Sequence, residues 1–244
     1  MATAVSVERW RTAQNAELGF WKEMEFHELV QTCAEKSEFW NQIDRDRIAT
    51  LLSGKDVLEI GCGPLGLSVA TFSGLGSTTR RLVKADPLPA LSVRETRPAR
   101  EAWAGKFLDW IEELAGQGEY VQMAGEDITF ESCFDTVVTY NVLDHVRAPL
   151  TILENARRAL RPGGTLVVGV DCLSVIGRLR FEWITRRLRR GTILVEAHPH
   201  TFRPRDVIAM IERAGLRLTA AHGLPGPLAG FAGRHVRPAF IAVR

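Results

Sequence analysis

A regular alternation of short apolar segments with helical patterns begins at Asp56 and continues to the end of the chain. Strands that alternate with helices indicate βαβ units, whose right-handed crossovers place helices on both faces of a parallel sheet. The expected strands cover residues 56–60, 81–86, 120–125, 135–141, 165–171, 216–223 and 239–244, and the expected helices cover 65–75, 98–115, 149–160 and 204–214. The sequence therefore predicts an α/β fold with a doubly wound, seven-stranded, Rossmann-like sheet.

The last two expected strands are connected differently from the others. The segment from Gly223 to Pro238 is rich in glycine and proline and has no helical pattern. Because a parallel connection needs a crossover, usually a helix, this segment predicts an antiparallel pairing at the end of the sheet.

Residues 1–50 carry helical patterns and no strand. Trp10, Gln14, Leu18 and Trp21 recur at helical spacing, which favours an amphipathic helix. We predict an N-terminal helical cap over residues 1–50 on one compact domain, residues 51–244, with residues 173–200 as a substrate lid.

Composition excludes several classes of protein. Hydrophobic residues make up 45% of the 244 residues, which is typical of a globular chain rather than a disordered or fibrous one. The net charge of +2 gives no global reason to expect a nucleic-acid or membrane partner. The apolar runs are shorter than the roughly 20 residues of a membrane span, and the N-terminus lacks the pattern of a signal peptide. Four scattered cysteines without a CxxC pair suit a reducing compartment, so we expect a cytoplasmic protein.

The strongest local motif is the segment VLEIGCGPLG at residues 57–66. Glycine lets the backbone approach a ligand closely, and the N-terminus of the following helix would supply N–H groups. Residues 61–66 match G-x-G-x-x-G, and Asp86 follows at the end of the second strand, where an acid would bind a ribose. The motif indicates a nucleoside-containing cofactor, although a turn without a ligand is the alternative. Glu59 would repel a diphosphate, and Pro64 removes one backbone donor.

The sequence resembles the class I S-adenosylmethionine-dependent methyltransferases. More narrowly, it is similar to their small-molecule, quinone-biosynthesis-like branch, methyltransferase type 11. The resemblance rests on several blocks in family order: VLEIGCGPLG at 57–66, Asp86-Pro87, GEDITFESCFDTVVTYNVLDHV at 125–146, LENARRALRPGGTLVVGVD at 153–171 and HPHTFRPRDVIAMIERAGLRL at 198–218.

The resemblance implies a seventh strand of reversed direction and roles for individual residues. Glu59, Gly61 and Gly63, with Cys62 between the glycines, would hold the methionine part of S-adenosylmethionine. Asp86 and the adjoining Pro87 would bind the ribose side, since an ionised carboxylate can accept hydrogen bonds from two hydroxyls. Glu126 or Asp127 would lie at the adenine edge. Asn141 would offer its carbonyl to the amino group of the cofactor, whose product form is S-adenosyl-L-homocysteine.

Three histidines are candidates for the chemistry. His145 could take a proton from an acceptor hydroxyl, although the favoured alternative is a structural histidine that caps the following helix or lines the cofactor. His198 and His200 flank Pro199 and would point the same way in an extended chain. Asp144 or Asp171 could orient a histidine or bind a substrate hydroxyl. Two loop histidines without a third defined ligand are a weak metal signal, so we predict no metal.

Residues 173–217 hold ten arginines against four acids, with the densest part at 178–190. This segment could attract an acidic or glycosylated metabolite, could contact RNA, or could be a solvated helix face. We predict methyl transfer from S-adenosylmethionine to a small molecule, most favourably to a hydroxyl oxygen. The alternatives are an RNA methyltransferase, an NAD-dependent oxidoreductase and a non-catalytic cofactor-binding protein. Neither a membrane nor a nucleic-acid partner is expected, and the sequence leaves a monomer and a homodimer open.

Overall fold

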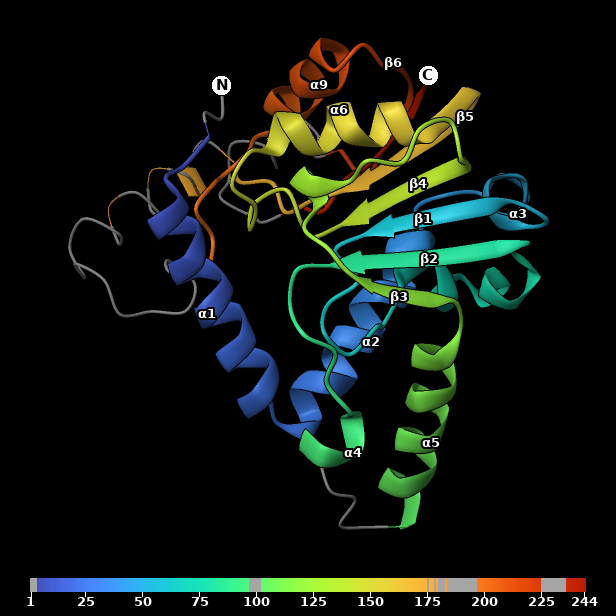
Figure 1. The fold of residues 1–244 in the computed structure, drawn as a ribbon, viewed down its shortest axis with the longest axis vertical. Helices are drawn as coiled ribbons and strands as arrows, with labels where there is room; N and C mark the ends of the chain where they lie inside the picture. Colours follow the sequence, from blue (N-terminus) through green and yellow to red (C-terminus); the bar gives the residue numbers. More distant parts are fainter. Residues whose placement is uncertain are drawn as a thin grey trace.

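A mixed seven-stranded sheet in the order β3-β2-β1-β4-β5-β7-β6 forms the centre of the molecule (Figure 1). The structure is a computed structural model that describes residues 4–96, 102–174, 176–177, 179, 183, 197–224 and 236–244. Its strands are β1 (Asp56–Ile60), β2 (Arg81–Asp86), β3 (Glu119–Gln122), β4 (Phe134–Tyr140), β5 (Leu160–Gly169), β6 (Arg217–His222) and β7 (Ala239–Val243).

Strands β1 to β5 pair in parallel, and β7 lies antiparallel between β5 and β6. The predicted fold class and the antiparallel end of the sheet are therefore confirmed. Because β1 lies between β2 and β4, the order of strands reverses there, and ligands of doubly wound sheets bind at such a point.

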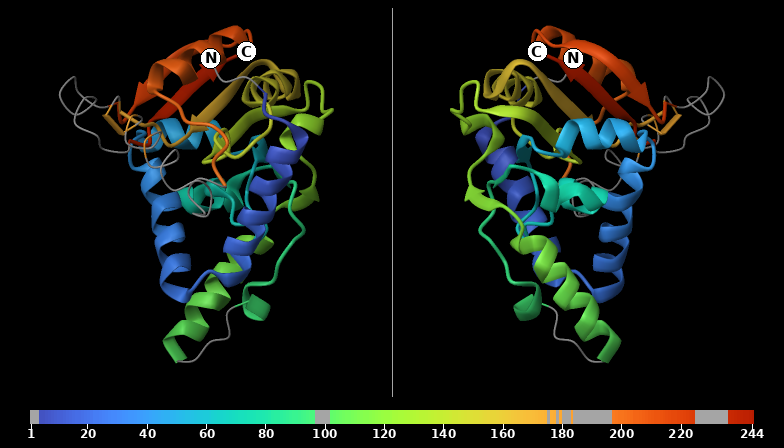
Figure 2. Two further views of the ribbon diagram at one scale, coloured as in Figure 1. Left: turned by 90° about the vertical axis from the view of Figure 1, so that its left-hand side faces the viewer. Right: turned by 90° about the vertical axis from the view of Figure 1, so that its right-hand side faces the viewer.

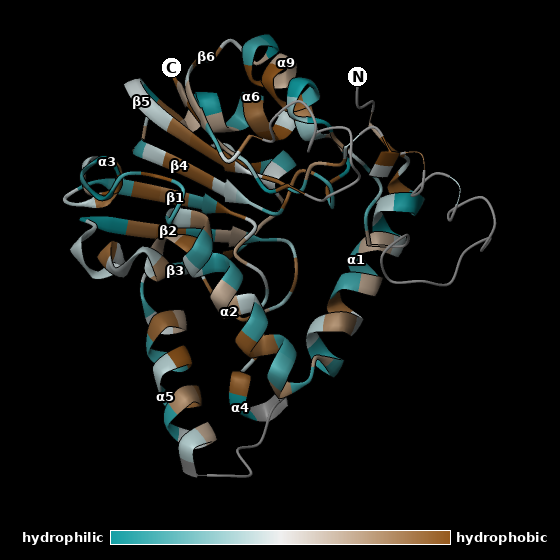
Figure 3. Cartoon of the chain, turned by 180° about the vertical axis from the view of Figure 1, so that it is seen from behind, coloured by the Kyte–Doolittle hydropathy of each residue, from teal (hydrophilic) through white to brown (hydrophobic). Residues whose placement is uncertain are grey.

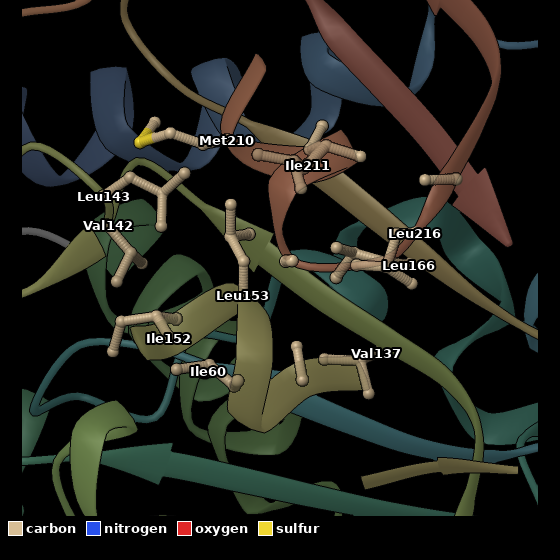
Figure 4. Packing of buried hydrophobic residues seen from close by; sticks show 14 of the residues in the cluster. Ile60, Val137, Val142, Leu143, Ile152, Leu153, Leu166, Met210, Ile211 and Leu216 are labelled. Carbon is tan, nitrogen blue, oxygen red and sulfur yellow. The ribbon is translucent and has the colours of Figure 1, made fainter. Parts of the chain in front are cut away.

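One face of the sheet is covered by α6 (Pro149–Ala159) and α9 (Pro204–Arg213), which contact each other. Val137 of β4, Leu166 of β5 and Phe240 of β7 belong to the core on this face. Figure 4 shows Ile152 of α6 beside Ile60 of β1, with further side chains of α6 and α9 pointing toward the strands. Burial of these apolar side chains supplies most of the favourable free energy of the layer.

On the opposite face of the sheet, the core is formed by the strand residues that alternate with those just named. Val138 of β4, Val167 of β5 and Ile241 of β7 pack with Phe39 and Trp40. Successive residues of a strand point to opposite faces, so neighbours such as Val137 and Val138 of β4 are both apolar because both faces of the sheet are covered. Figure 3 shows brown stretches within the inner strands, and the helices carry both brown and teal residues.

The N-terminal region forms the helices α1 (Val7–Glu23), α2 (Phe26–Trp40) and α3 (Arg45–Leu52). The helical prediction for this region is confirmed, although α3 runs past residue 50. Figures 1 and 2 show α1 and α2 diverging from a common tip, with the far end of α5 (Ala102–Gly116) nearby, whereas the short α4 (Val93–Thr96) lies beside that tip. The division at residue 50 stays a prediction.

The segment after β1 differs from the expected helix over 65–75. Residues 63–66 form a turn, and regular helical structure begins only near Val69, continuing into the π-helical turn η1 (Thr71–Leu75) and the 3-10 turn η2 (Gly76–Thr78). Gly66 and Gly74 have positive φ angles of 65° and 75°, which right-handed helices do not contain. The glycines therefore shorten the helix and lengthen the loop.

Two further features bear on the predictions. Most of the proposed lid at 173–200, including the arginines of 178–190, lies outside the described residues. Among the helices that the structure describes, none combines the length and the apolar character that a membrane crossing requires.

Candidate active site

A cavity of about 300 Å³ lies at the carboxyl ends of β1, β2 and β4, beneath the N-terminal helices. The described residues that line it come from four regions: Gln14, Glu17, Phe20 and Trp21 of α1; Thr32, Glu35 and Lys36 of α2; Gly61, Cys62, Gly63, Asp86, Pro87 and Leu88 at the ends of β1 and β2 and in the loops that follow; and Tyr140, Asn141, Val142, His145, Val146, Ala197 and His198 from the end of β4 to the segment before α9. Most of the residues predicted from the sequence therefore meet here, together with residues of α1 and α2 that were not predicted.

The glycine loop forms the floor of the cavity. Gly61 and Gly63 both have a φ angle of 81°, in the left-handed region that side chains disfavour. A Cβ at Gly61 would lie 2.1 Å from a Val142 methyl carbon, and one at Gly63 would lie 3.0 Å from the Trp21 ring. Both glycines are thus required by backbone conformation and by space, and the loop stays open only without side chains there.

Asp86 ends β2 and is buried, with 5% of its surface exposed. Its Oδ2 accepts the Gly63 amide at 2.8 Å, and its Oδ1 accepts the Leu88 amide at 3.0 Å. Burial raises the pKa of this carboxyl to about 6, although the two amide hydrogen bonds oppose the rise. The carboxylate is therefore anchored at the cavity wall, and each oxygen retains capacity for a further donor.

Asn141 follows β4 with a φ of 56°, and its backbone amide bonds the Gly169 carbonyl at 2.8 Å. Asparagine tolerates this left-handed conformation better than most residues. Its Oδ1 is buried and has no hydrogen-bond partner among the described residues. A buried acceptor without a partner costs free energy, so a ligand donor at this point would be favourable.

Glu59 was expected to hold the methionine part of the cofactor, but the cavity lining does not include it. Its side chain is fully buried and accepts hydrogen bonds from the Ser68 hydroxyl and from the amides of Val69 and Ala70. The amides at the start of the helix after β1, which the sequence predicted would face a ligand, are therefore satisfied inside the protein.

Glu126 and Asp127 lie in the 3-10 turn η3 (Gly125–Asp127), and neither lines the cavity. Oε1 of Glu126 accepts the amides of Arg147 and Ala148 at 2.8 and 3.1 Å, just before α6. This carboxylate supports the start of α6, where free amides favour a negative charge. The Asp127 residue is exposed. An adenine contact by either residue stays a prediction.

His145 is largely buried at the cavity wall. Its Nδ1 lies 3.0 Å from the Ala197 carbonyl oxygen, which can only accept, so Nδ1 carries the hydrogen in the neutral ring. Nε2 then bears the lone pair, and it has no hydrogen-bond partner in the described part of the chain. Burial disfavours the charged ring, but the nearby carboxylates of Asp144 and Glu17 outweigh this effect and raise the pKa.

His198 joins this group, whereas His200 does not. The rings of His145 and His198 have centroids 4.2 Å apart, and Asp144 Oδ2 lies 3.7 Å from His145 Nε2 and 3.6 Å from His198 Nε2. His200 is buried, with Nε2 2.9 Å from the Val146 carbonyl oxygen, and burial lowers its pKa. Its contacts indicate a structural role.

Asp144, His145 and His198 could also hold a divalent ion, because their ligand atoms all lie within 4.8 Å of one another. Imidazole and carboxylate are common ligands of such ions. Asp171 does not join the cluster; it pairs with Arg237, whose guanidinium also reaches Glu35 Oε2 at 2.9 Å and the Tyr140 hydroxyl at 3.0 Å. The prediction of no metal stays a prediction.

The individual residues that α1 and α2 contribute to the cavity were not predicted from the sequence. Trp21 Nε1 donates to Glu17 Oε1 at 2.9 Å, and Glu17 Oε2 lies 3.4 Å from His145 Nδ1. A signal was present, because Gln14 and Glu17 interrupt the apolar face of α1 and Lys36 interrupts that of α2. Polar residues on a buried helix face need partners or a ligand.

Comparison with known proteins decides what kind of site this is. The profile of the family described as "Methyltransferase domain" matches residues 39–221. The chain belongs to this methyltransferase family. Membership confirms the predicted resemblance to class I methyltransferases and, with it, S-adenosylmethionine as the cofactor.

Individual relatives agree with the family. The methyltransferase is 28% identical over 165 residues to the mitochondrial ubiquinone biosynthesis O-methyltransferase of Schizosaccharomyces pombe, which covers 68% of this chain and 54% of that protein. It is 30% identical over 187 residues to the ubiquinone biosynthesis O-methyltransferase of Cereibacter sphaeroides, covering 72% of this chain and 66% of that one. The chain therefore spans between about half and two thirds of these relatives.

A solved structure shows the same fold. The 1,6-didemethyltoxoflavin-N1-methyltransferase of Burkholderia thailandensis, solved with 1,6-didemethyltoxoflavin and S-adenosylhomocysteine, aligns with a TM-score of 0.54 at 15% identity. The alignment covers 100% of this methyltransferase and 92% of that chain.

The residues of the cavity fit S-adenosylmethionine. Two side-chain-free positions, Gly61 and Gly63, leave room against the backbone. The anchored Asp86 carboxylate suits a pair of ribose hydroxyls, and the unpartnered Asn141 Oδ1 suits an ammonium donor. The bound compound would supply a methyl group attached to a sulfonium sulfur. After transfer of the methyl group, the rest of the compound would leave as a neutral thioether.

Proposed function

We propose that this methyltransferase methylates a hydroxyl oxygen of a small molecule. The observation that carries the proposal is His145 Nε2, a buried lone pair at the cavity wall without a partner among the described residues. The printed activity of the ubiquinone biosynthesis relatives, O-methylation, supports the same acceptor atom. The whole activity remains a proposal because the chain spans only part of those relatives.

The proposed residue roles follow from the geometry. Gly61, Gly63, Asp86 and Asn141 hold the cofactor, and positioning supplies much of the rate because the leaving group needs no protonation. His145 Nε2 accepts the proton of the acceptor hydroxyl as the oxygen attacks, and Nδ1 keeps its hydrogen bond to the Ala197 carbonyl. Asp144 and Glu17 stabilise the imidazolium that forms.

Helix α1 contributes a hydrogen-bond-accepting oxygen to the site where the methyl-accepting substrate would bind. Gln14 Nε2 donates to the His145 carbonyl at 3.4 Å, and Gln14 Oε1 is buried without a partner in the described part of the chain. If the methylated substrate carries a second hydroxyl next to the first, that second hydroxyl could donate a hydrogen bond to Gln14 Oε1. Phenols and catechols are therefore the first acceptors to test.

The test uses purified protein, methyl-labelled S-adenosylmethionine and three fractions as acceptors: a panel of phenols and catechols, bulk tRNA and a bulk protein fraction. We expect label in the small-molecule panel, with an O-methyl ether as the product by nuclear magnetic resonance. His145→Gln should lower the rate by at least about 100-fold, the lower end of the range for general-base catalysis. Labelled tRNA with an unlabelled panel would overturn the proposal in favour of the RNA alternative, and labelled amines would overturn the choice of oxygen.

A further inference from the structure

Lys36 is a charged residue on the buried face of a helix. On α2 it follows Leu29 and Cys33 at helical spacing and precedes Trp40, and all three of these neighbours are buried. Only 6% of the surface of Lys36 is exposed, and the residue lines the cavity. A buried lysine ammonium is rare unless an anion accompanies it.

The polar groups around Lys36 make their hydrogen bonds to residues other than Lys36. Glu35 binds Arg237, the Asp86 oxygens accept two backbone amides, and the Tyr140 hydroxyl contacts Arg237. The Lys36 ammonium lies 5.6 Å from the Tyr140 ring centroid, a cation–π contact. Within the described residues, no hydrogen bond or ion pair reaches this ammonium. The cavity therefore contains a buried cation with three N–H donors that the protein leaves available.

We propose that Lys36 binds the carboxylate of a ligand in this cavity. Burying an ammonium costs free energy that an ion pair with good hydrogen bonds recovers, so the site favours an anion. A carboxylate fits better than a diphosphate, because Glu17, Glu35 and Asp86 also line the cavity and one lysine cannot balance several negative charges. The inference rests on the proposed function. The carboxylate comes either from the amino-acid end of the cofactor or from an acidic acceptor.

Two pairs of probes distinguish these sources, since each pair differs in a carboxylate alone. The first pair is S-adenosylhomocysteine and its decarboxylated form, S-adenosyl-3-thiopropylamine. The second pair is 3,4-dihydroxybenzoate and catechol, titrated with the adenosyl compound present. Calorimetry measures each dissociation constant for the wild-type protein, Lys36→Met, Lys36→Arg and the control Lys22→Met, which removes an exposed lysine of α1.

We expect the wild-type protein to bind the carboxylate-bearing compound of one pair more tightly than its partner. Lys36→Met should raise the dissociation constant of that compound by about 10- to 100-fold, the range expected for the loss of a charge-assisted hydrogen bond. The carboxylate-free partner should change less than about twofold, and Lys36→Arg and Lys22→Met should keep the preference. The pair that responds identifies the source.

The proposal is overturned if Lys36→Met leaves the affinities for both carboxylate-bearing compounds unchanged, or lowers the affinity for such a compound and for its carboxylate-free partner equally. Should Lys36→Met fail to fold, the wild-type titrations still decide, because equal affinity within both pairs excludes a carboxylate site. The proposed function fails separately: it fails if the wild-type protein binds neither adenosyl compound.

Discussion

The Oδ2 atom of Asp86 accepts a hydrogen bond from the Gly63 amide, 2.8 Å away, and so joins the end of β2 to the glycine loop after β1. These residues lie 23 positions apart in the sequence and meet because β1 and β2 are parallel neighbours with Ile60 opposite Ala85. The same carboxylate lines the cavity, so the group that fixes the loop is also the group proposed to bind the ribose.

The affinity for S-adenosylhomocysteine should fall as pH is lowered through about 6, the pKa to which burial raises Asp86. A protonated carboxyl loses one of its acceptor sites for ribose hydroxyls, so affinity should fall by up to about tenfold per pH unit below that pKa. Calorimetry at pH 5 to 8 measures the effect. Asp86→Asn should bind weakly at every pH, and an equally steep curve for that variant would assign the titration to another group.

Protein stability should respond to Asp86 in the opposite direction. Because the folded-state pKa lies above the unfolded value of 3.8, the folded state binds more protons between pH 4 and 6. The contribution of this group to the free energy of unfolding therefore falls as pH rises through that window. The difference in urea stability between the wild-type protein and Asp86→Asn should change over the same window, and a difference that is constant from pH 4 to 7 would contradict this.

Replacement of Glu59 should affect folding. Glu59→Ala leaves the Ser68 hydroxyl and the Val69 amide buried without their acceptor, whereas the Ala70 amide keeps its hydrogen bond to Ser68 Oγ at 3.1 Å. An unsatisfied buried donor costs about 1–3 kcal/mol, so the free energy of unfolding should drop by about 3 kcal/mol or more in urea titrations. The control Glu23→Ala, at an exposed residue, should be nearly neutral. A stable Glu59→Ala protein that fails to bind S-adenosylhomocysteine would instead support the cofactor role expected from the resemblance.

Gly63→Ala should disturb both the loop and Trp21. The φ of 81° costs an L-residue about 1–2 kcal/mol, and the added Cβ lies 3.0 Å from the Trp21 ring. We expect lower stability, weaker binding of S-adenosylhomocysteine and a changed indole fluorescence. Gly54→Ala has a similar φ of 67° but open space around its Cβ, so it should lower stability without changing binding. Equal binding losses in both variants would show that backbone strain alone is responsible.

The pH dependence of turnover should report the carboxylates beside His145. The unprotonated ring is the proton acceptor, so kcat/KM for the methyl acceptor, measured at saturating S-adenosylmethionine to remove the effect of Asp86 on cofactor binding, should rise with pH through the pKa of His145, which Asp144 and Glu17 raise. Glu17→Gln removes one of these charges, so the rising limb of kcat/KM should move to lower pH. His145→Gln should abolish the limb. An unchanged profile in Glu17→Gln would mean that His145 is not the titrating group.

Much of the fold could be predicted from the sequence, because local patterns determine it. The segments 56–60 and 81–86 are short, have apolar residues at their centres and precede turn residues, and their predicted ends match β1 and β2. The helix expected at 65–75 was too long because Gly66 and Gly74 adopt positive φ, which a glycine permits without requiring.

The site was predictable where a motif carried it. Gly61, Gly63, Asp86 and Asn141 follow strands whose carboxyl ends meet at the cavity. Lys36 and Glu17 depend on how α1 and α2 lie over the sheet, and helical periodicity shows only that each interrupts an apolar face. The hydrogen-bond partners of Glu59 could not be predicted either, because a sequence motif does not show whether a carboxylate points to a ligand or to the backbone.

The most direct test of the central claim is calorimetric titration of the purified protein with S-adenosylhomocysteine, with NADH as the control ligand and Asp86→Ala as the variant. The account predicts saturable binding of S-adenosylhomocysteine with one site per chain, at least tenfold weaker binding in a folded Asp86→Ala protein, and no binding of NADH. Folded wild-type protein that binds NADH, or that does not bind S-adenosylhomocysteine, would contradict it.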